Sequence, residues 1–337
     1  MKTEILYPLE NGDAVNKAAQ ILKAGGTVAM PTETVYGLAA NAFSKSAIEK
    51  IFTAKGRPQD NPLIVHISNT DMLYDIVEDV PEIAIKLAKR FWPGPFTMIL
   101  KRNGKIPACV SAGLDTVAVR CPDNKIAREL IEKSGLPLAA PSANLSGKPS
   151  PTTAQHVIDD LSGKIDAVLV GNECTVGVES TVITLVGEPK LLRPGAVTVE
   201  ELKEFLPQIS VDKAVLSQPK AGEKVASPGM KYKHYAPKTE TYLCEGNRED
   251  FVNFVNCKEN SVAVCFLEEA NLINIKNIPY GSENDQSTLA KNVFAVLRNV
   301  DSLNANAVYV HAPNKSGVGL AVYNRLIRAA AFRVIEL

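Results

Sequence analysis

The sequence has little of the chemistry that cross-links a chain or anchors it in a membrane. None of the six cysteines belongs to a C-x-x-C pair or has a histidine at a zinc-binding spacing, so we interpret them as small, mostly buried residues in a reducing compartment. No apolar run approaches the roughly 20 residues that span a bilayer. The first residues, MKTEILYPLENGD, lack the apolar segment of a signal peptide. These absences predict a cytoplasmic protein without a membrane span.

The chain also lacks an excess of either charge, with 37 Lys and Arg residues against 37 Asp and Glu residues. A protein that holds long nucleic acid mainly through the phosphates should be basic, because that affinity is largely electrostatic. The balance argues against non-specific RNA or DNA binding, although a local basic patch is compatible with it. We therefore expect weak or no direct nucleic-acid binding.

The common nucleotide-binding signatures are missing as well. There is no G-x-x-x-x-G-K-[ST] motif. The stretch GVGLAV begins like a dinucleotide fingerprint, but Val322 stands where the last glycine should be, and no acidic residue follows at the required distance. If the protein binds ATP, it uses another device.

What is present is an α/β pattern in two parts. Strand-like segments rich in β-branched residues alternate with amphipathic helical segments, and the irregular order predicts a mixed sheet. We expect strands over residues 27–30, 62–67, 96–101, 116–121, 167–171 and 180–186. We expect helices over residues 14–25, 47–55, 81–92, 124–134, 152–161 and 198–206.

The pattern dissolves after residue 207, where prolines accumulate and periodicity is lost. A second α/β pattern follows, with strands expected over 241–244, 262–266 and 307–313 and helices over 249–256, 287–303 and 319–331. The sequence thus predicts a large domain over residues 1–207, a linker over 208–238 and a small Rossmann-like domain over 239–337.

Two stretches carry polar side chains next to predicted strands. PTETVYGLAANAF (residues 31–43) directly follows a strand, at the edge where α/β proteins place ligands, and offers hydroxyl groups and the carboxylate of Glu33. Local capping by threonine explains it equally well. In KGRPQDNPLIVH (residues 55–66), Lys55 and Arg57 would either complement a helix end or hold phosphates, with His66 nearby.

Further candidates lie in later loops. Arg120 and Arg193 each end a predicted strand, and residues 138–153 form a hydroxyl-rich loop that suits either ligand contacts or a local turn. Several cations near the loops of one domain favour an anionic ligand. The connector SPGMKYKHYAP (residues 227–237) holds anion-binding and ring side chains between two prolines. It is either a solvated hinge or a lid.

These stretches together resemble the YrdC-type threonylcarbamoyl-adenylate synthases in their longer, two-domain form. The resemblance runs in order through PTETVYGLAANAF, KGRPQDNPLIVHI, PGPFTMIL, VAVRCP, APSANLSGKPSPT, ESTVI, LLRPG and SPGMKYKHYAP. It implies a large YrdC-like domain with a twisted mixed sheet, followed by the linker and the small Rossmann-like domain. The last domain resembles the family more weakly, chiefly through GVGLAVYNRLIRAA.

The resemblance implies an enzyme that makes threonylcarbamoyl-AMP and pyrophosphate from L-threonine, bicarbonate and ATP. A separate transferase would pass the product to tRNA. The implied threonine pocket is lined by Thr34, His66, Arg120, Ala140 and Ser180. The implied ATP site is formed by Arg57, Asn61, Thr116, Ser142, Ser150, Arg193, His234 and Tyr235. Lys55 and Arg57 would be the catalytic cations.

Mg²⁺ would ride on the phosphates of ATP without protein ligands, which fits the lack of an acidic cluster. His66 would either accept the ammonium proton of threonine or only bind threonine, so the general base stays open. Residues 227–237 would close over the intermediate and exclude water. Two other classes compete. They are a carbamoyl transferase of the hydrogenase-maturation type and a non-catalytic binder of double-stranded RNA.

Overall fold

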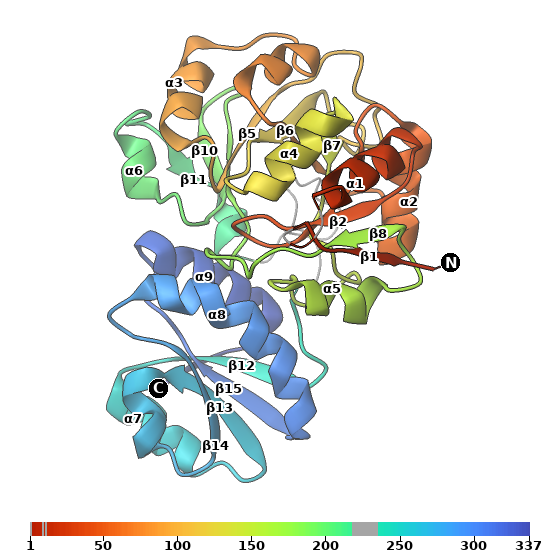
Figure 1. Ribbon diagram of the computed structural model, residues 1–337. Coiled ribbons are helices and arrows are strands. Elements are labelled where there is room, and N and C mark those ends of the chain that lie inside the picture. Colours follow the sequence, from red (N-terminus) through yellow and green to blue (C-terminus); the bar gives the residue numbers. More distant parts are fainter. Residues whose placement is uncertain (1, 9, 11, 218–234) are drawn as a thin grey trace.

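The computed structural model describes residues 2–8, 10, 12–217 and 235–337 of the chain. Two sheets organise it (Figure 1). The larger sheet has the strand order β1-β8-β2-β3-β7-β4-β6-β5-β9-β10-β11 and mixes parallel with antiparallel pairs. The smaller sheet has the order β14-β13-β15-β12-β16, and all its pairs are parallel. The predicted mixed α/β fold with a second, Rossmann-like domain is confirmed.

The strands of the larger sheet are β1 (Glu4–Leu6), β2 (Val28–Met30), β3 (Gly37–Asn41), β4 (Ile64–His66), β5 (Phe96–Lys101), β6 (Thr116–Arg120), β7 (Leu138–Ala139), β8 (Ala167–Leu169), β9 (Thr181–Thr184), β10 (Lys190–Arg193) and β11 (Ser210–Val211). The α-helices of this part are α1 (Ala14–Lys23), α2 (Lys45–Lys55), α3 (Glu82–Phe91), α4 (Lys125–Ser134), α5 (Ala154–Leu161) and α6 (Val199–Lys203). The 3₁₀ turns are η1 (Thr70–Asp75) and η2 (Lys213–Val215). β11 and η2 lie beyond residue 207, where we expected only a linker.

The second domain contains β12 (Glu240–Glu245), β13 (Ser261–Phe266), β14 (Lys276–Gly281), β15 (Ala307–His311) and β16 (Val334–Glu336). Its α-helices are α7 (Arg248–Asn256), α8 (Gln286–Asn299) and α9 (Gly317–Ala329), with 3₁₀ turns η3 (Leu267–Leu272) and η4 (Val300–Leu303). The expected 287–303 helix is therefore an α-helix that tightens into a 3₁₀ turn for its last residues.

The two domains share apolar packing. Helices α8 and α9 lie on the side of the small sheet that faces the first domain (Figure 1). Val35 and Val178 of the first domain belong to the same buried cluster as Phe294 of α8 and Leu326 of α9. Burial of such surface is the main favourable term in association, so the second domain is packed onto the first rather than tethered to it.

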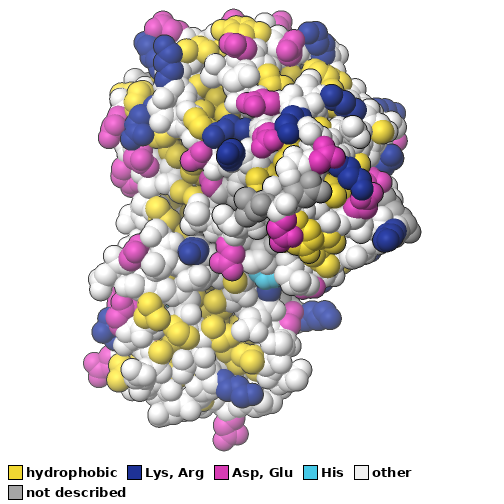
Figure 2. All heavy atoms as spheres, in the orientation of Figure 1, with side chains coloured by type: hydrophobic (Ala, Val, Ile, Leu, Met, Phe, Trp, Pro, Cys, Tyr) yellow, Lys and Arg dark blue, Asp and Glu magenta, His cyan; other side chains and the backbone are white. Residues whose placement is uncertain are grey.

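Charges are interspersed on the face shown in Figure 2, where Lys and Arg side chains alternate with Asp and Glu side chains over both domains. The described cysteines are unpaired, and four of them are buried, as the sequence predicts: Cys121, Cys174, Cys244 and Cys265. Among the described residues, no helix is both long enough and apolar enough to cross a bilayer.

Candidate active site

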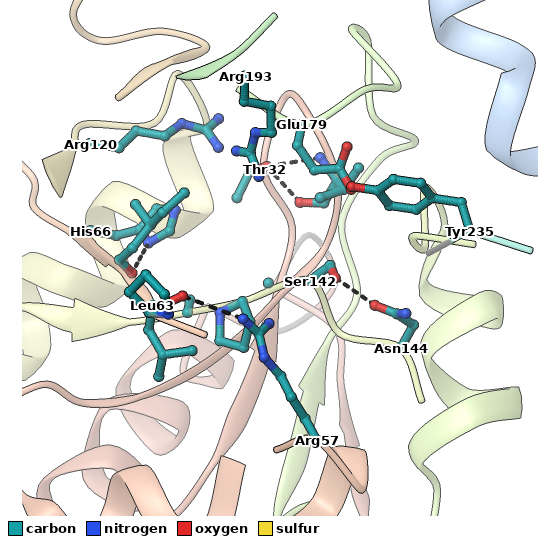
Figure 3. A pocket seen from close by; sticks show the side chains of 16 residues that line it. Thr32, Arg57, Leu63, His66, Arg120, Ser142, Asn144, Glu179, Arg193 and Tyr235 are labelled. Carbon is teal, nitrogen blue, oxygen red and sulfur yellow. Dashed lines mark hydrogen bonds between the residues drawn. The ribbon is translucent and has the colours of Figure 1, made fainter. Parts of the chain in front are cut away.

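A pocket lies where several strand ends of the larger sheet converge with Tyr235, a described residue near the end of the expected linker (Figure 3). Its lining comes from loops after β2, α2 and β7, from the ends of β4, β6 and β10, and from the residue two positions before β9. The residues that line it are Thr32, Val35, Gly37, Arg57, Pro62, Leu63, Ile64, His66, Arg120, Ala140, Pro141, Ser142, Asn144, Glu179, Arg193 and Tyr235. Seven of the predicted site residues are among them: Arg57, His66, Arg120, Ala140, Ser142, Arg193 and Tyr235.

Sheet register places His66 beside Arg120. β4 and β6 run parallel and pair these two residues at their last positions. The His66 ring is buried, and its Nδ1 lies 3.2 Å from Ile64 O. Burial, and then the charge of Arg120, lower the pKa of His66 to about 3. The imidazole is therefore neutral near pH 7 and offers one donor and one acceptor.

Arg120 faces the carboxylate of Glu33, which the sequence analysis named only as a polar group near a predicted strand. Its Nη2 lies 2.6 Å from Glu33 Oε2, and both side chains are buried. Neither the Arg120 Nη2 nor either Glu33 carboxylate oxygen makes a hydrogen bond within the described residues. Buried polar atoms are nearly always hydrogen-bonded, so these atoms could still form hydrogen bonds with a ligand.

The KGR stretch separates its two cations. Lys55 is the last residue of α2, Gly56 follows in the left-handed conformation at φ 59°, and Arg57 leaves the helix in a new direction. The Arg57 Nη2 donates to Asn61 O at 3.2 Å and Pro62 O at 3.3 Å. Its Nε and the Asn61 Oδ1 are buried without a hydrogen bond among the described residues. Arg57 thus reaches the pocket with a donor to spare.

Lys55 turns away from the pocket instead. Its Nζ donates to Ser142 O at 2.5 Å and Asn144 O at 2.6 Å, and it lies 3.3 Å from Asn144 Oδ1. Burial, and then the charge of Arg57, hold the pKa of Lys55 well below its usual range. The ammonium group stands behind the 140–144 loop and supports it. The predicted catalytic role of Lys55 stays a prediction.

Arg193 links the two expected ligand sites. Its Nε donates to Ser180 O at 3.0 Å, and its Nη2 lies 3.1 Å from Ser180 Oγ. Ser180 Oγ also lies 2.7 Å from Thr97 Oγ1. Burial lowers the pKa of Arg193 to about 10, which still leaves the guanidinium charged at neutral pH. An expected threonine residue and an expected ATP residue are therefore in direct contact.

Glu179 brings a second carboxylate to the pocket. Its Oε1 accepts a hydrogen bond from Ser150 Oγ at 2.5 Å, and its Oε2 accepts one from Arg325 Nε at 2.8 Å. Burial alone would raise the pKa of Glu179, but the charges of Arg325 and Arg193 lower it to about 2. Glu179 is ionised near pH 7. It was not among the predicted site residues, although it lies within the ESTVI stretch.

Tyr235 closes one side of the pocket. It is buried, its backbone φ is +63°, and its ring centroid lies 5.0 Å from that of Phe294. Figure 3 shows its ring pointing from the linker end toward Glu179. The next residue, Ala236, donates its backbone N–H to Gly147 O at 3.1 Å. His234 and residues 227–233 of the expected lid lie outside the described residues.

Other predicted residues surround the lining without forming it. The Thr34 and Thr32 hydroxyls are 2.8 Å apart, and Asn61, Ser150 and Ser180 lie in the network just described. Thr116 is the exception. It begins β6 while Arg120 ends it, so the strand separates them, and Thr116 lines a different hollow beside Asp115 and Thr184. Within the described chain, no three His, Cys, Asp or Glu side chains group closely enough to hold a metal ion.

Comparisons with known proteins account for both domains. A family model described as "Telomere recombination" matches residues 20–195, and one described as "Threonylcarbamoyl-AMP synthase, C-terminal domain" matches residues 197–331. The threonylcarbamoyl-AMP synthase of Pyrococcus abyssi is 43% identical over 330 residues, which cover 95% of each chain. That of Bacillus subtilis is 43% identical over 333 residues, covering 97% of this chain and 95% of the relative.

A solved structure agrees along the whole length. The crystal structure of P. abyssi Sua5 complexed with L-threonine matches with a TM-score of 0.91 and 38% identity, and the match covers 100% of both chains. The chain therefore belongs to the two-domain threonylcarbamoyl-AMP synthases, which are enzymes of the nucleotidyltransferase type.

Proposed function

We propose that the protein makes L-threonylcarbamoyl-AMP from L-threonine, bicarbonate and ATP and releases pyrophosphate. The observation that carries the proposal is the convergence of Arg57, Arg120 and Arg193 on one pocket beside the neutral ring of His66. Three cations suit a reaction that brings a carboxylate against a polyphosphate. The threonine complex of P. abyssi Sua5 supports the choice of amino acid.

Threonine would bind at the β4–β6 end of the pocket. Arg120 can hold its carboxylate by a two-point contact, since its Nη2 has no hydrogen bond within the described residues. His66 and the backbone at Ala140 line the same side, while Thr34 and Ser180 lie just behind. Glu33 offers two buried acceptor oxygens to the ammonium group.

ATP would bind toward Arg57, Ser142 and Arg193, with Asn61 and Ser150 in support and Tyr235 against it. Mg²⁺ would enter on the phosphates as part of the substrate, held by phosphate oxygens and water. His234, outside the described residues, and Thr116, at the far end of β6, stay predicted ATP ligands.

The chemistry would run in two steps. The threonine amine, after losing a proton from its ammonium form, bonds to the carbon of bicarbonate with loss of water and gives N-carboxythreonine. A carboxylate oxygen of that carbamate then bonds to the α-phosphorus of ATP while the bond to the pyrophosphate oxygen breaks. Positioning and cationic groups dominate such transfers, because two anions must meet.

Enclosure would protect the labile carbamate and its adenylate from water. Tyr235 and the residues before it would supply that cover. We place the reaction in the cytoplasm, as the cysteine usage predicts, where a transferase would take the product to tRNA.

The test is pyrophosphate release by the purified chain with ATP, Mg²⁺ and bicarbonate. L-threonine should support release, while L-serine, L-valine and the absence of amino acid should not. Release that needs no amino acid, or no release from folded protein that binds ATP, would contradict the proposal.

A further inference from the structure

One fully buried side chain crosses from the second domain into the wall of the pocket. Arg325, in the middle of α9, is 0% exposed. Its Nε donates to Glu179 Oε2 at 2.8 Å, its Nη1 donates to Pro194 O at 2.9 Å, and its Nη2 lies 3.3 Å from Glu179 O. A single guanidinium group thus holds two segments of the first domain that lie far from it in the chain.

These two segments flank neighbouring strands. Glu179 comes just before β9 and Pro194 just after β10, and the two strands pair antiparallel. Gly195 allows the segment after β10 to pass close to the start of β9, because a Cβ at this position would lie only 2.4 Å from the backbone nitrogen of Thr181. Arg325 therefore fixes the ends of both strands next to Ser180 and Arg193, the residues expected to meet threonine and ATP.

The contact between Arg325 and Glu179 also affects the electrostatics of the pocket wall. Glu179 lines the pocket and holds Ser150 through its other carboxylate oxygen. A buried carboxylate beside a polyphosphate site would repel the ligand unless a cation offsets it. Arg193 is one such cation within the lining, and Arg325 supplies a second from outside it, with a direct hydrogen bond to the carboxylate.

We propose that Arg325 is a positioning residue of the synthase reaction, supplied by the second domain. It holds Glu179 and the ends of β9 and β10 in place, and it offsets the Glu179 charge so that ATP phosphates can bind beside it. The second domain then completes the nucleotide site. This inference rests on the proposed function.

The test compares three variants of the full chain by the KM for ATP in pyrophosphate release at saturating threonine and bicarbonate. We expect Arg325→Met to raise this KM at least tenfold, because Glu179 loses one of its two neighbouring cations and the segments beside β9 and β10 lose the group that holds both. Adding Glu179→Gln to it should lower the KM again at least threefold. The matched control is Arg298→Met, which removes another arginine of the domain interface. Arg298 pairs with Asp160 at 2.8 Å and donates to Pro149 O at 2.5 Å, and none of these three residues lines the pocket.

The control should keep its KM within twofold of the parent, because Asp160 retains Lys148 at 2.8 Å. A KM for Arg325→Met within twofold of the parent or of Arg298→Met would overturn the inference. So would an Arg325→Met/Glu179→Gln variant as impaired as Arg325→Met alone. These outcomes separate a role in the site from simple domain docking, which would affect both arginine variants alike.

Two further measurements keep the test sharp. If Arg325→Met fails to give a cooperative thermal melt, Arg325→Lys replaces it. Lysine keeps the charge but cannot hold both Glu179 and Pro194 as the guanidinium does, so a parental KM in this variant would overturn the positioning role. Calorimetry with α,β-methylene-ATP repeats the comparison as a dissociation constant. If the parent chain makes no threonine-dependent pyrophosphate, the proposed function fails, while the nucleotide affinities of the same variants still decide the role of Arg325.

Discussion

Arg120 and Glu33 lie 2.6 Å apart as a buried ion pair, yet the Arg120 Nη2 and both Glu33 oxygens make no hydrogen bond within the described residues. The two opposite charges are therefore in contact, while these three atoms still lack hydrogen-bond partners. A zwitterionic amino acid carries the two missing partners, a carboxylate for Arg120 and an ammonium for Glu33. In the proposed function, the pair would therefore already be arranged to accept the amino acid.

The substitution Glu33→Gln tests whether the Arg120–Glu33 pair accepts an amino acid. Removing one partner of a buried pair leaves the other charge unbalanced, so we expect the free energy of unfolding to fall by about 3–5 kcal/mol. L-threonine should restore part of it, because its carboxylate gives Arg120 a new partner. The measurement is the rise in melting temperature with saturating L-threonine, which should be larger in the variant than in the parent. L-threoninamide, which lacks the carboxylate, is the control, and equal shifts in both proteins would contradict the prediction.

Lys55→Met should destabilise the 140–144 loop, which forms part of the pocket wall. The Lys55 ammonium satisfies two backbone carbonyls of the 140–144 loop. Leaving buried acceptors unsatisfied costs about 1–3 kcal/mol each, and the loop that carries Ser142 would move. We expect at least a tenfold loss of kcat/KM for ATP. Lys50→Met on the same helix is the control, since exposed Lys50 donates to Gly25 O away from the pocket; equal losses in the two variants would refute the supporting role.

Tyr235 should act mainly through its ring. Tyr235→Ala removes the tilted ring contact with Phe294 and opens the pocket, so pyrophosphate release should fall at least tenfold. Tyr235→Phe keeps that ring contact and should retain most of the rate. Tyr74→Ala serves as control, because that tyrosine is 64% exposed and lies outside the pocket lining. A Tyr235→Ala variant with the parental rate would remove Tyr235 from the cover of the site.

His66 should make stability depend on pH. Its pKa is about 3 in the folded chain against an ordinary 6.5, so between these values the unfolded chain binds a proton that the folded chain does not. The free energy of unfolding therefore falls as the pH falls through this window. Glu179, whose pKa drops from 4.5 to about 2, adds a loss of the same sign only at lower pH.

Denaturant unfolding at pH 6.5 and pH 5 isolates the histidine. Between pH 6.5 and pH 5, we expect the free energy of unfolding to fall by about 1–2 kcal/mol less in His66→Gln than in the parent. Parallel decline of the two proteins would show that His66 titrates normally in the folded chain.

The fold was largely predictable where hydrophobic periodicity is strong, as in β5, β6 and α4. It was not predictable for β3, whose sequence GLAAN has weak strand propensity and becomes a strand because β2 and β7 pair with it. β14 and β16 were missed for a related reason. Each lies at an edge of the small sheet, where pairing with β13 or β12 stabilises it.

The site was predictable only in its composition. The motifs identify Arg57, His66, Arg120 and Arg193, but they do not say which side chains face the pocket. Lys55 and Arg57 are two positions apart, and the left-handed Gly56 between them sends one behind the loop and one to the lining. Arg325 could not be found, because its partner Glu179 lies 146 positions earlier in the chain.

That separation has a consequence for synthesis on the ribosome. The first strand, β1, pairs with β8 and must wait for Leu169 before it has a neighbour in the sheet. Glu179 waits much longer, since the 146 residues up to Arg325 take roughly 7–30 s to translate at about 5–20 residues per second. Until then a nascent first domain holds the Glu179 carboxylate with the charge of Arg193 but without Arg325. All residues that line the pocket are therefore made before Arg325, which holds the pocket wall from the second domain.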